Sequence, residues 1–294
     1  MADFMQQVVA GLASGSIYAS LALALVLIHR ATGVINFAQG EMATLSTYIA
    51  WTLTTNHGWG YWPAFAFTLA VSFLGGAAVH QTVIRPNDKG SLLRVVIVTI
   101  GLLIMINGLV TLIWGGEVRA VPSPFPSGTT EIAGVAITTQ DIGTILVVVA
   151  TVVVLWLMFQ YTKIGLAMRA AAVNPDEARL VGVRVTWMLS LGWGLAAVLG
   201  AIAGMLAAPS VFLDPNLMAA ILIYAFAAAV LGGIDSPVGA VVGGLTLGVG
   251  LNLIGAYVDF VGTDLRLPVA LLVILVVLLV RPAGIFGREE VRRV

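Results

Sequence analysis

The segment VINFAQGEMATLSTY holds Glu41, the one acidic residue that falls inside an apolar run of this chain. A charge at the centre of a bilayer costs about 2.5–3.5 kcal/mol on insertion scales, so such residues are usually functional. Glu41 therefore has two interpretations. It lines a transport pathway or gate, or it belongs to a hydrogen-bonded helix entrance two turns from the cytoplasmic end, where water lowers the cost. Asn36 would cap this helix and Gln39 lies near the same depth, which makes all three candidate pathway residues.

Gly232 and Gly233 interrupt another apolar run, between Leu231 and Ile234. When a helix breaks inside a membrane, the backbone groups at its end stay unpaired, and the helix dipole gives that end a partial charge that can bind a solute. The glycine pair and the 33–41 segment are both predicted on the cytoplasmic side, which favours an inner gate over a high-affinity pocket. Structural necessity alone also explains the glycines.

Most enzyme chemistries are missing from the sequence. There is no cysteine, so disulfides, thiolate metal sites and cysteine nucleophiles are excluded. The chain has no G-x-x-x-x-G-K-[ST], H-E-x-x-H or G-x-S-x-G motif, and no pair of intramembrane aspartates. Its three histidines lie far apart and near the ends of apolar runs. We therefore expect no enzyme activity, no metal and no cofactor in this chain, and Glu41 alone is thin support for coupling to protons or sodium.

A polar, basic stretch, TKIGLAMRAAAVNPDEARLVGVRVT, lies at about 162–186 between two apolar runs. The part from Gly165 to Ala172 is rich in good helix formers. Asn174 is placed to cap a second short helix, with proline at its first position, two acids in its first turn and a glycine past its end. A structured helical loop of this kind is what a membrane protein shows to a soluble partner. The candidate contact residues are Gly165, Arg169, Asn174, Pro175, Asp176, Glu177, Ala178 and Gly182.

Composition places these residues in a membrane protein. The 294 residues are 60% hydrophobic and 10% charged, with a mean hydropathy of +1.04. Soluble domains carry about 25% charged residues, so this chain has too few to cover a water-facing surface. The formal net charge of zero argues against a nucleic-acid partner. The N-terminus MADFMQQ lacks a basic region, so no cleaved signal peptide is expected. The fold class is all-α, polytopic and membrane-integral, in a single domain over 1–294.

Nine apolar runs are long enough to be membrane helices, which need roughly 20 residues for a core of about 30 Å. They are about 8–28, 34–54, 61–84, 95–114, 142–160, 187–208, 216–232, 237–258 and 265–280. The seventh is short and glycine-terminated, so it is a full span or a broken, re-entrant helix. The sequence thus predicts eight or nine crossings.

Lysine and arginine placement predicts an N-out, C-in orientation. With the N-terminus outside, only Arg119 and Arg266 of the 14 basic residues fall outside. The other twelve fall inside: Arg30, Arg85, Lys89, Arg94, Lys163, Arg169, Arg179, Arg184, Arg281, Arg288, Arg292 and Arg293.

The predicted external loop, about 115–141, contains the alternating EIAGVAIT, which indicates either a short hairpin or an irregular connector.

Small residues recur at four-residue spacing, a pattern that lets helices approach closely in lipid. These rows serve packing within the chain or form a dimer face. They are Gly11-Gly15-Ala19, Gly200-Gly204, Ala240-Gly244-Gly248 and Gly239-Gly243.

The sequence resembles the permease subunits of bacterial ABC importers for branched-chain amino acids, the LivH type with relatives for urea and amides. The resemblance covers essentially the whole chain and rests on five blocks in order. They are GLASGSIYASLALAL (11–25), GVINFAQGEMATLSTY (33–48), TKIGLAMRAAAVNPDEARLVGV (162–183), LGGIDSPVGAVVGGLTLG (231–248) and LLVRPAGIFG (278–287).

This resemblance implies a location in the bacterial plasma membrane and several partners. Two separate cytoplasmic ATPases use ATP, an external solute-binding protein delivers the solute, and a second, homologous permease completes the pore. Importer permeases of this superfamily carry a cytoplasmic E-A-A-x-x-x-G loop that docks into a cleft of the ATPase. Asp176-Glu177-Ala178 followed by Gly182 resembles that loop, with Asp for the first Glu and Glu for the first Ala.

Several functions stay open from sequence alone. The leading one is import of branched-chain or related amino acids, and urea or short amides are alternatives within the same class. A self-sufficient secondary transporter or channel would need no ATPase, and a membrane scaffold would carry no flux.

Overall fold

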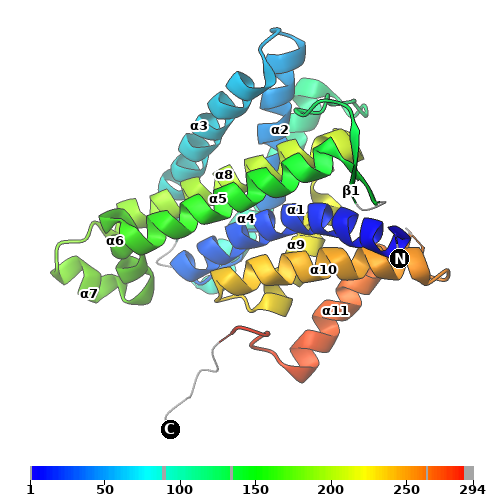
Figure 1. The fold of residues 1–294 in the computed structure, drawn as a ribbon. Helices are drawn as coiled ribbons and strands as arrows, with labels where there is room; N and C mark the ends of the chain where they lie inside the picture. Colours follow the sequence, from blue (N-terminus) through cyan, green and yellow to red (C-terminus); the bar gives the residue numbers. More distant parts are fainter. Residues whose placement is uncertain (1, 88–90, 133–134, 263, 288–294) are drawn as a thin grey trace.

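The computed structural model describes residues 2–87, 91–132, 135–262 and 264–287 (Figure 1). Lys89, Arg288, Arg292 and Arg293, which the orientation prediction counts, lie outside the described residues. The helices are α1 (Ala2–Thr32), α2 (Gln39–Thr55), α3 (Tyr61–Val79) with the π-helix η1 (His80–Ile84), α4 (Leu92–Trp114), α5 (Thr139–Tyr161), α6 (Lys163–Val173), α7 (Pro175–Leu180), α8 (Val185–Val211), α9 (Ala219–Gly232), α10 (Pro237–Tyr257) and α11 (Arg266–Val280). The strands are β1 (Thr129–Ile132) and β2 (Val135–Thr138).

Each predicted membrane span falls on a helix of the structure. Among the described residues, six helices are long and apolar enough to cross a membrane: α1, α3 with η1, α4, α5, α8 and α10. The apolar helices α9 and α11 have 14 and 15 residues, and the less apolar α2 has 17. At 1.5 Å per residue these three cover about 21–26 Å, less than a hydrocarbon core of about 30 Å.

The most extensive helix–helix packing among the described residues joins α1 to α10, which run side by side in Figure 1. A Cβ added to Gly15 would lie 2.9 Å from the Gly244 carbonyl oxygen, and one added to Gly11 would lie 2.7 Å from Val249 Cα. The other small-residue rows pack α8 on α2 and α10 on α9, through Gly200 and Gly243 among others. The prediction of intramolecular packing is confirmed. A dimer face on these rows is wrong, because the chain itself occupies them.

Helix α2 begins halfway along the bundle rather than at its end. Ser20, in the middle of α1, donates a hydrogen bond to the Leu199 carbonyl of α8 at 3.0 Å, and Gln39 donates one to the Ala196 carbonyl at 2.8 Å. The first residue of α2 is therefore level with the middle of both long helices. Segment 33–38 returns to this depth from the end of α1. Its six residues span at most about 20 Å, which matches the roughly 18 Å rise of the last twelve residues of α1.

A second return segment, 212–218, leads from the end of α8 to the start of α9. An added Cβ on Gly40, in the first turn of α2, would lie 3.5 Å from Met218 Cβ and 3.3 Å from Leu222 Cδ2. Helix α9 therefore starts at the same depth as α2. The helix is unbroken, and the part of this region that re-enters the bundle is the segment before it.

The predicted hairpin is confirmed. Strands β1 and β2 pair antiparallel from Thr129 opposite Thr138 to Ile132 opposite Val135. Thr138 then caps α5, since its hydroxyl accepts a hydrogen bond from the Asp141 amide at 3.1 Å. The hairpin lies at the end of the bundle opposite α6 and α7 (Figure 1).

Candidate functional site

A polar cluster surrounds Glu41 in the first turn of α2. Its side chain is buried, with 7% exposed, and Oε2 accepts a hydrogen bond from Asn107 Nδ2 of α4 at 3.3 Å. The Asn107 amide nitrogen also lies 3.1 Å from the Pro215 carbonyl oxygen and 3.3 Å from Asn216 Oδ1, both in the second return segment. One asparagine thus joins α2, α4 and segment 212–218 at half depth.

The prediction that Glu41 lies two turns inside a helix that starts near the cytoplasmic end is wrong. The helix starts at Gln39 because segment 33–38 returns into the bundle before any helical turn forms. Glu41 therefore occupies the first turn, where the positive end of the helix dipole favours a carboxylate. Its depth comes from the return segment and not from its distance along a helix.

Asn36 and Gln39 hold this helix start in place. Asn36 is not the N-cap residue, which is Ala38; its Oδ1 instead accepts the Ala38 amide at 3.1 Å. Its Nδ2 donates to Gln39 Oε1 at 3.2 Å, and Gln39 Nε2 donates to the Ala196 carbonyl of α8. Both side chains are fully buried. Their polar atoms are used for positioning, so these two candidates support Glu41 rather than sharing its surface.

Two further polar side chains follow Glu41 on the same face of α2. Thr44 and Tyr48 lie three and seven residues later, the spacing of one helix face. Both are fully buried, and neither hydroxyl has a hydrogen-bond partner among the described residues. A buried unsatisfied polar group costs about 1–3 kcal/mol, so these hydroxyls can hydrogen-bond to a water or solute. The ring of Tyr48 lies 5.1 Å from that of Trp114 on α4.

A cation lies at the far end of this α2–α4 face. Arg119 donates from Nη2 to the Trp114 carbonyl at 2.6 Å, and its guanidinium carbon lies 4.5 Å from the centroid of the Trp51 ring. Its backbone pairs with Leu213 in the second return segment. The face therefore has a carboxylate at one end and a guanidinium at the other, with hydroxyl and aromatic groups between them.

Sequence reasoning missed the partners of Glu41. Asn107 falls inside the predicted span 95–114, where an interhelical hydrogen bond explains it, and Asn216 is the first residue of the predicted span 216–232. One local signal was present for Thr44 and Tyr48, since both recur on the helix face of Glu41. Nothing local placed Asn107 beside Glu41, because 66 residues separate them in sequence.

The predicted gate glycines lie elsewhere. The Gly232 carbonyl accepts a hydrogen bond from the Phe286 amide at 3.0 Å, and Gly233 has a φ of +106°. A Cβ added to Gly233 would lie 2.7 Å from the Gly287 nitrogen. These glycines let the segment after α11 pack on the end of α9. The length of α9, about 21 Å, separates them from the Glu41 cluster, so the structure does not bring the two candidate gates together.

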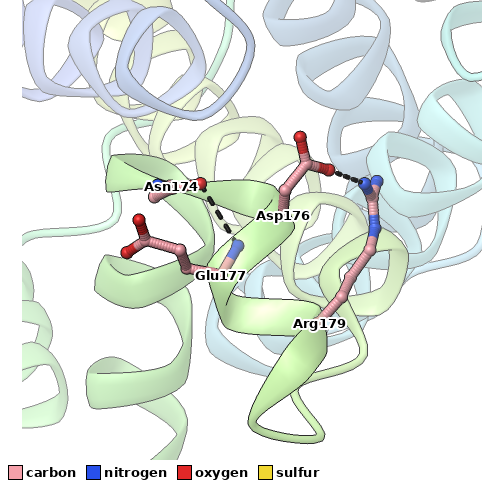
Figure 2. A network of polar contacts seen from close by, with 4 residues as sticks. All are labelled: Asn174, Asp176, Glu177 and Arg179. Atoms are coloured by element: carbon pink, nitrogen blue, oxygen red, sulfur yellow. Dashed lines mark hydrogen bonds and ion pairs between the residues drawn. The ribbon is translucent and has the colours of Figure 1, made fainter.

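The predicted helical loop is confirmed as two capped helices, α6 and α7 (Figure 2). Asn174 Oδ1 accepts the Glu177 amide at 3.2 Å, and Pro175 is the first residue of α7. Asp176 and Arg179 form an ion pair at 2.6 Å on the exposed side. The helix ends before Gly182, which has a φ of +86°.

The eight predicted contact residues divide by exposure. Pro175, Asp176, Glu177 and Gly182 are exposed, and Asn174 is half-buried in its capping role. Ala178 is buried, as is Gly165, whose added Cβ would lie 2.5 Å from Phe159 Cα. These two fix the helix pair to α8 and α5. Arg169 turns inward, toward a cavity between helices.

Exposed apolar side chains complete the tip of the helix pair. Val173, Leu180 and Val181 are 79%, 88% and 78% exposed. Val173 ends α6, Leu180 ends α7 and Val181 follows it, and this helix pair projects from one end of the bundle (Figure 1). Sequence reasoning selected the charged and glycine positions here and missed these apolar ones. The resulting exposed surface mixes charged and apolar side chains on a capped helix pair.

Comparison with known proteins identifies the family. Residues 7–280 match the family described as "Branched-chain amino acid transport system / permease component". The chain is 33% identical to the high-affinity branched-chain amino acid transport system permease protein BraD of Pseudomonas aeruginosa and 31% identical to LivH of Escherichia coli K12. Each alignment covers 99% of this chain and 98% of the relative.

A solved structure shows the same fold. The structure of PsaBC from Streptococcus pneumoniae in complex with Fab contains a chain that matches with a TM-score of 0.51 at 16% identity. The match covers 93% of this chain and 91% of that one. On its family match, which extends over almost its whole length, this chain belongs to the permease components of branched-chain amino acid transport systems.

Proposed function

We propose that this chain is the membrane-spanning subunit of an ATP-driven importer for branched-chain or related amino acids. It forms one multi-pass domain in the bacterial plasma membrane, with eight or nine crossings and its N-terminus outside. Two cytoplasmic ATPases, an external solute-binding protein and a second, homologous permease complete the importer. The observation that carries this proposal is the full-length similarity to BraD and LivH, both named as permeases of high-affinity branched-chain amino acid transport.

We assign the translocation pathway to the face between α2, α4 and segment 212–218. Asn216 is exposed and Asn107 half-buried, next to the Glu41 carboxylate at half depth. Polar and ionisable groups at this depth face a water-filled cavity or a protein, since lipid does not satisfy them. A second permease packed over the exposed apolar side chains of α4, such as Ile104 and Leu112, would enclose that cavity.

This face suits an amino-acid zwitterion. The Glu41 carboxylate is placed to accept hydrogen bonds from an ammonium group. The N-terminal end of α9, which packs on Gly40 beside Glu41, offers partial positive charge to the carboxylate of the same solute. Arg119 stacks on Trp51, about 15 Å further along α2, and offers positive charge at a later point of the route. The buried, unpaired hydroxyls of Thr44 and Tyr48 and the ring of Trp114 lie along the α2–α4 face between Glu41 and Arg119. Little fixed charge is needed, because the external binding protein selects the solute first.

Energy reaches this pathway through α6 and α7. The pair is a capped, rigid unit joined directly to the ends of α5 and α8. Closure of the ATPases on ATP would move the pair as a body and tilt these two helices, which is a rigid-body switch between inward- and outward-open states. Asp176, Glu177 and the apolar tip are the surface that the ATPase would contact.

Reconstitution tests the proposal. The test uses proteoliposomes with this chain, its partner permease and both ATPases, and with the binding protein outside. They should take up radiolabelled leucine only when ATP is enclosed in the vesicle lumen, on the side of the ATPases. Urea and acetamide, offered in the same assay, separate the amide-importing alternative. Gradient-driven accumulation by this chain alone would overturn the proposal in favour of a secondary transporter, and absence of any flux would favour a scaffold.

A further inference from the structure

A cavity of about 370 Å³ lies between α1, α5, α6, α8 and α10, at the end of the bundle that carries α6 and α7. Its walls are apolar, with Leu23, Val152, Phe159 and Val241 among the lining side chains. This volume lies in the range of small-molecule sites. The cavity is separate from the Glu41 face, since none of its lining residues belongs to α2 or α4.

Two guanidinium groups stand at this apolar cavity. Arg30 comes from the last turn of α1, and Arg169 comes from the middle of α6. Among the described residues neither forms an ion pair, and the buried Nε of Arg169 has no hydrogen-bond partner. Asp235, the acid nearest in sequence to the cavity-lining Pro237, lies 3.5 Å from His29 instead. The site therefore carries positive charge beside an apolar volume.

These features match one class of molecule. We infer that the cavity binds an acyl chain of an anionic phospholipid, with the lipid phosphate held between Arg30 and Arg169. Arginine pairs with phosphate through two parallel hydrogen bonds, and basic pockets between helices on the cytoplasmic side recognise anionic headgroups. A zwitterionic lipid fits less well, because its own ammonium group would meet the two guanidiniums.

The surroundings also suit a lipid. Trp156 lines the cavity and is 52% exposed, as expected for a ring at the membrane interface. The positive-inside rule places this end of the bundle at the cytoplasmic leaflet, so the assignment of the leaflet rests on the proposed function. Because Arg169 belongs to α6, a bound lipid would tie this coupling helix to α1 and would make coupling depend on anionic lipid.

Lipid retention tests the inference directly. The full chain, purified in mild detergent from vesicles of equal phosphatidylglycerol and phosphatidylcholine, should retain phosphatidylglycerol over phosphatidylcholine by about tenfold or more, as one charge-assisted pair predicts. The double variant Arg30→Gln, Arg169→Gln should lose this preference. Arg179→Gln, which removes an exposed arginine of α7 that does not line the cavity, should keep it.

A cavity-filling variant separates the acyl site from the charges. A Cβ at Gly192 would lie 3.7 Å from Met168 Cε, an ordinary contact, so Gly192→Phe should fold and should displace the lipid while both arginines remain. Equal retention of both lipids by the wild type overturns the inference, as does unchanged retention in the double variant or loss of lipid when the ATPases bind. Lipid retention is measured without transport, so the two proposals are tested separately. If the importer takes up leucine with ATP but the chain retains no phosphatidylglycerol, the lipid inference is refuted and the proposed function stands.

Discussion

Glu41 carries a carboxylate at a depth where lipid does not satisfy one, and this carboxylate accepts a hydrogen bond from the Asn107 amide. The pair crosses from α2 to α4 and reaches Pro215 and Asn216 beyond. If this side chain accepts the ammonium group of a solute, its charge matters more than its shape.

Glu41→Gln keeps the shape and removes the charge. We expect leucine uptake by the reconstituted importer to fall about tenfold or more, because a hydrogen bond to a charged group contributes about 1.5–3 kcal/mol. Glu117→Gln, in the exposed loop after α4, is the matched control and should transport normally. Wild-type uptake by Glu41→Gln would remove this residue from the pathway.

The cap of α7 provides a second test at the residue scale. Asn174→Ala removes the side-chain acceptor for the Glu177 amide and should destabilise this helix by about 1 kcal/mol. We expect faster hydrogen exchange of the 175–180 amides and less leucine moved per ATP hydrolysed. Asn174→Asp restores an acceptor and should recover both quantities. Equal coupling in all three proteins would exclude the cap from energy transfer.

Single residues were predictable where their chemistry is local. Asn174, Pro175 and Gly182 form a capping pattern within nine residues, and the structure contains it as predicted. The depth of Glu41 was not predictable, because it depends on contacts with α8 and α4 that are remote in sequence. The residues around Arg169 predict that it lies in a helix. They do not predict that its side chain lines a cavity, because that cavity is formed together with the distant helix α1.

At the scale of elements, the α1–α10 contact depends on the absence of side chains. Gly15→Ala would place a Cβ 2.9 Å from the Gly244 oxygen and 3.0 Å from Leu245 Cα, so the helices must separate. We expect a loss of about 1–3 kcal/mol in stability, seen as a lower melting temperature in detergent. Gly250→Ala on α10 meets nothing within 4 Å and should melt no lower than the wild type. A similar melting temperature for both variants would contradict this packing.

The turn after α7 sets the direction in which the chain enters α8. Gly182 has a φ of +86°, which costs an ordinary residue about 1–2 kcal/mol, and there is open space around it. Gly182→Val should therefore act through the backbone, uncoupling ATP hydrolysis from uptake without affecting membrane insertion. Gly182→Asn, which tolerates this conformation, should couple better than the valine variant. Uptake per ATP is the measurement, and equal values would separate this turn from coupling.

Elements were predictable where length and apolar content decide them. Every predicted span falls on a helix, and the hairpin at 129–138 follows its alternating pattern. The return segments 33–38 and 212–218 were not predictable in the same way. The sequence places most of the first segment in the predicted span 34–54, and divides the second between a connection and the predicted span 216–232. Only packing against α8 and α2 shows that both segments run back into the bundle without regular helix.

At the scale of the whole molecule, the proposed orientation is open to direct labelling because the chain has no cysteine. A cysteine introduced at exposed Val181 should react with an impermeant maleimide only in inside-out vesicles. A cysteine at Ser127, in the loop before the hairpin, should react only in right-side-out vesicles. Labelling of Val181→Cys from the outside would reverse the topology and remove the coupling role of α6 and α7.

The whole-molecule fold and family were accessible from sequence, since five ordered blocks and the hydropathy pattern cover the chain. The polar face between α2 and α4 was not. It exists only when α2, which begins at half depth, meets α4 and the segment 212–218 that returns from α8, and no single segment of the sequence predicts that contact.

The segment after α11, residues 281–287, has a practical consequence. Its Ile285 and Phe286 amides bond to the last carbonyls of α9, at Leu231 and Gly232, so it is fastened to that helix from outside the bundle. A fluorophore or spin label attached at position 286, where the Phe286 side chain is 46% exposed, would then move together with α9. Tilting of this short helix during the transport cycle would become visible without inserting a reporter into the solute route.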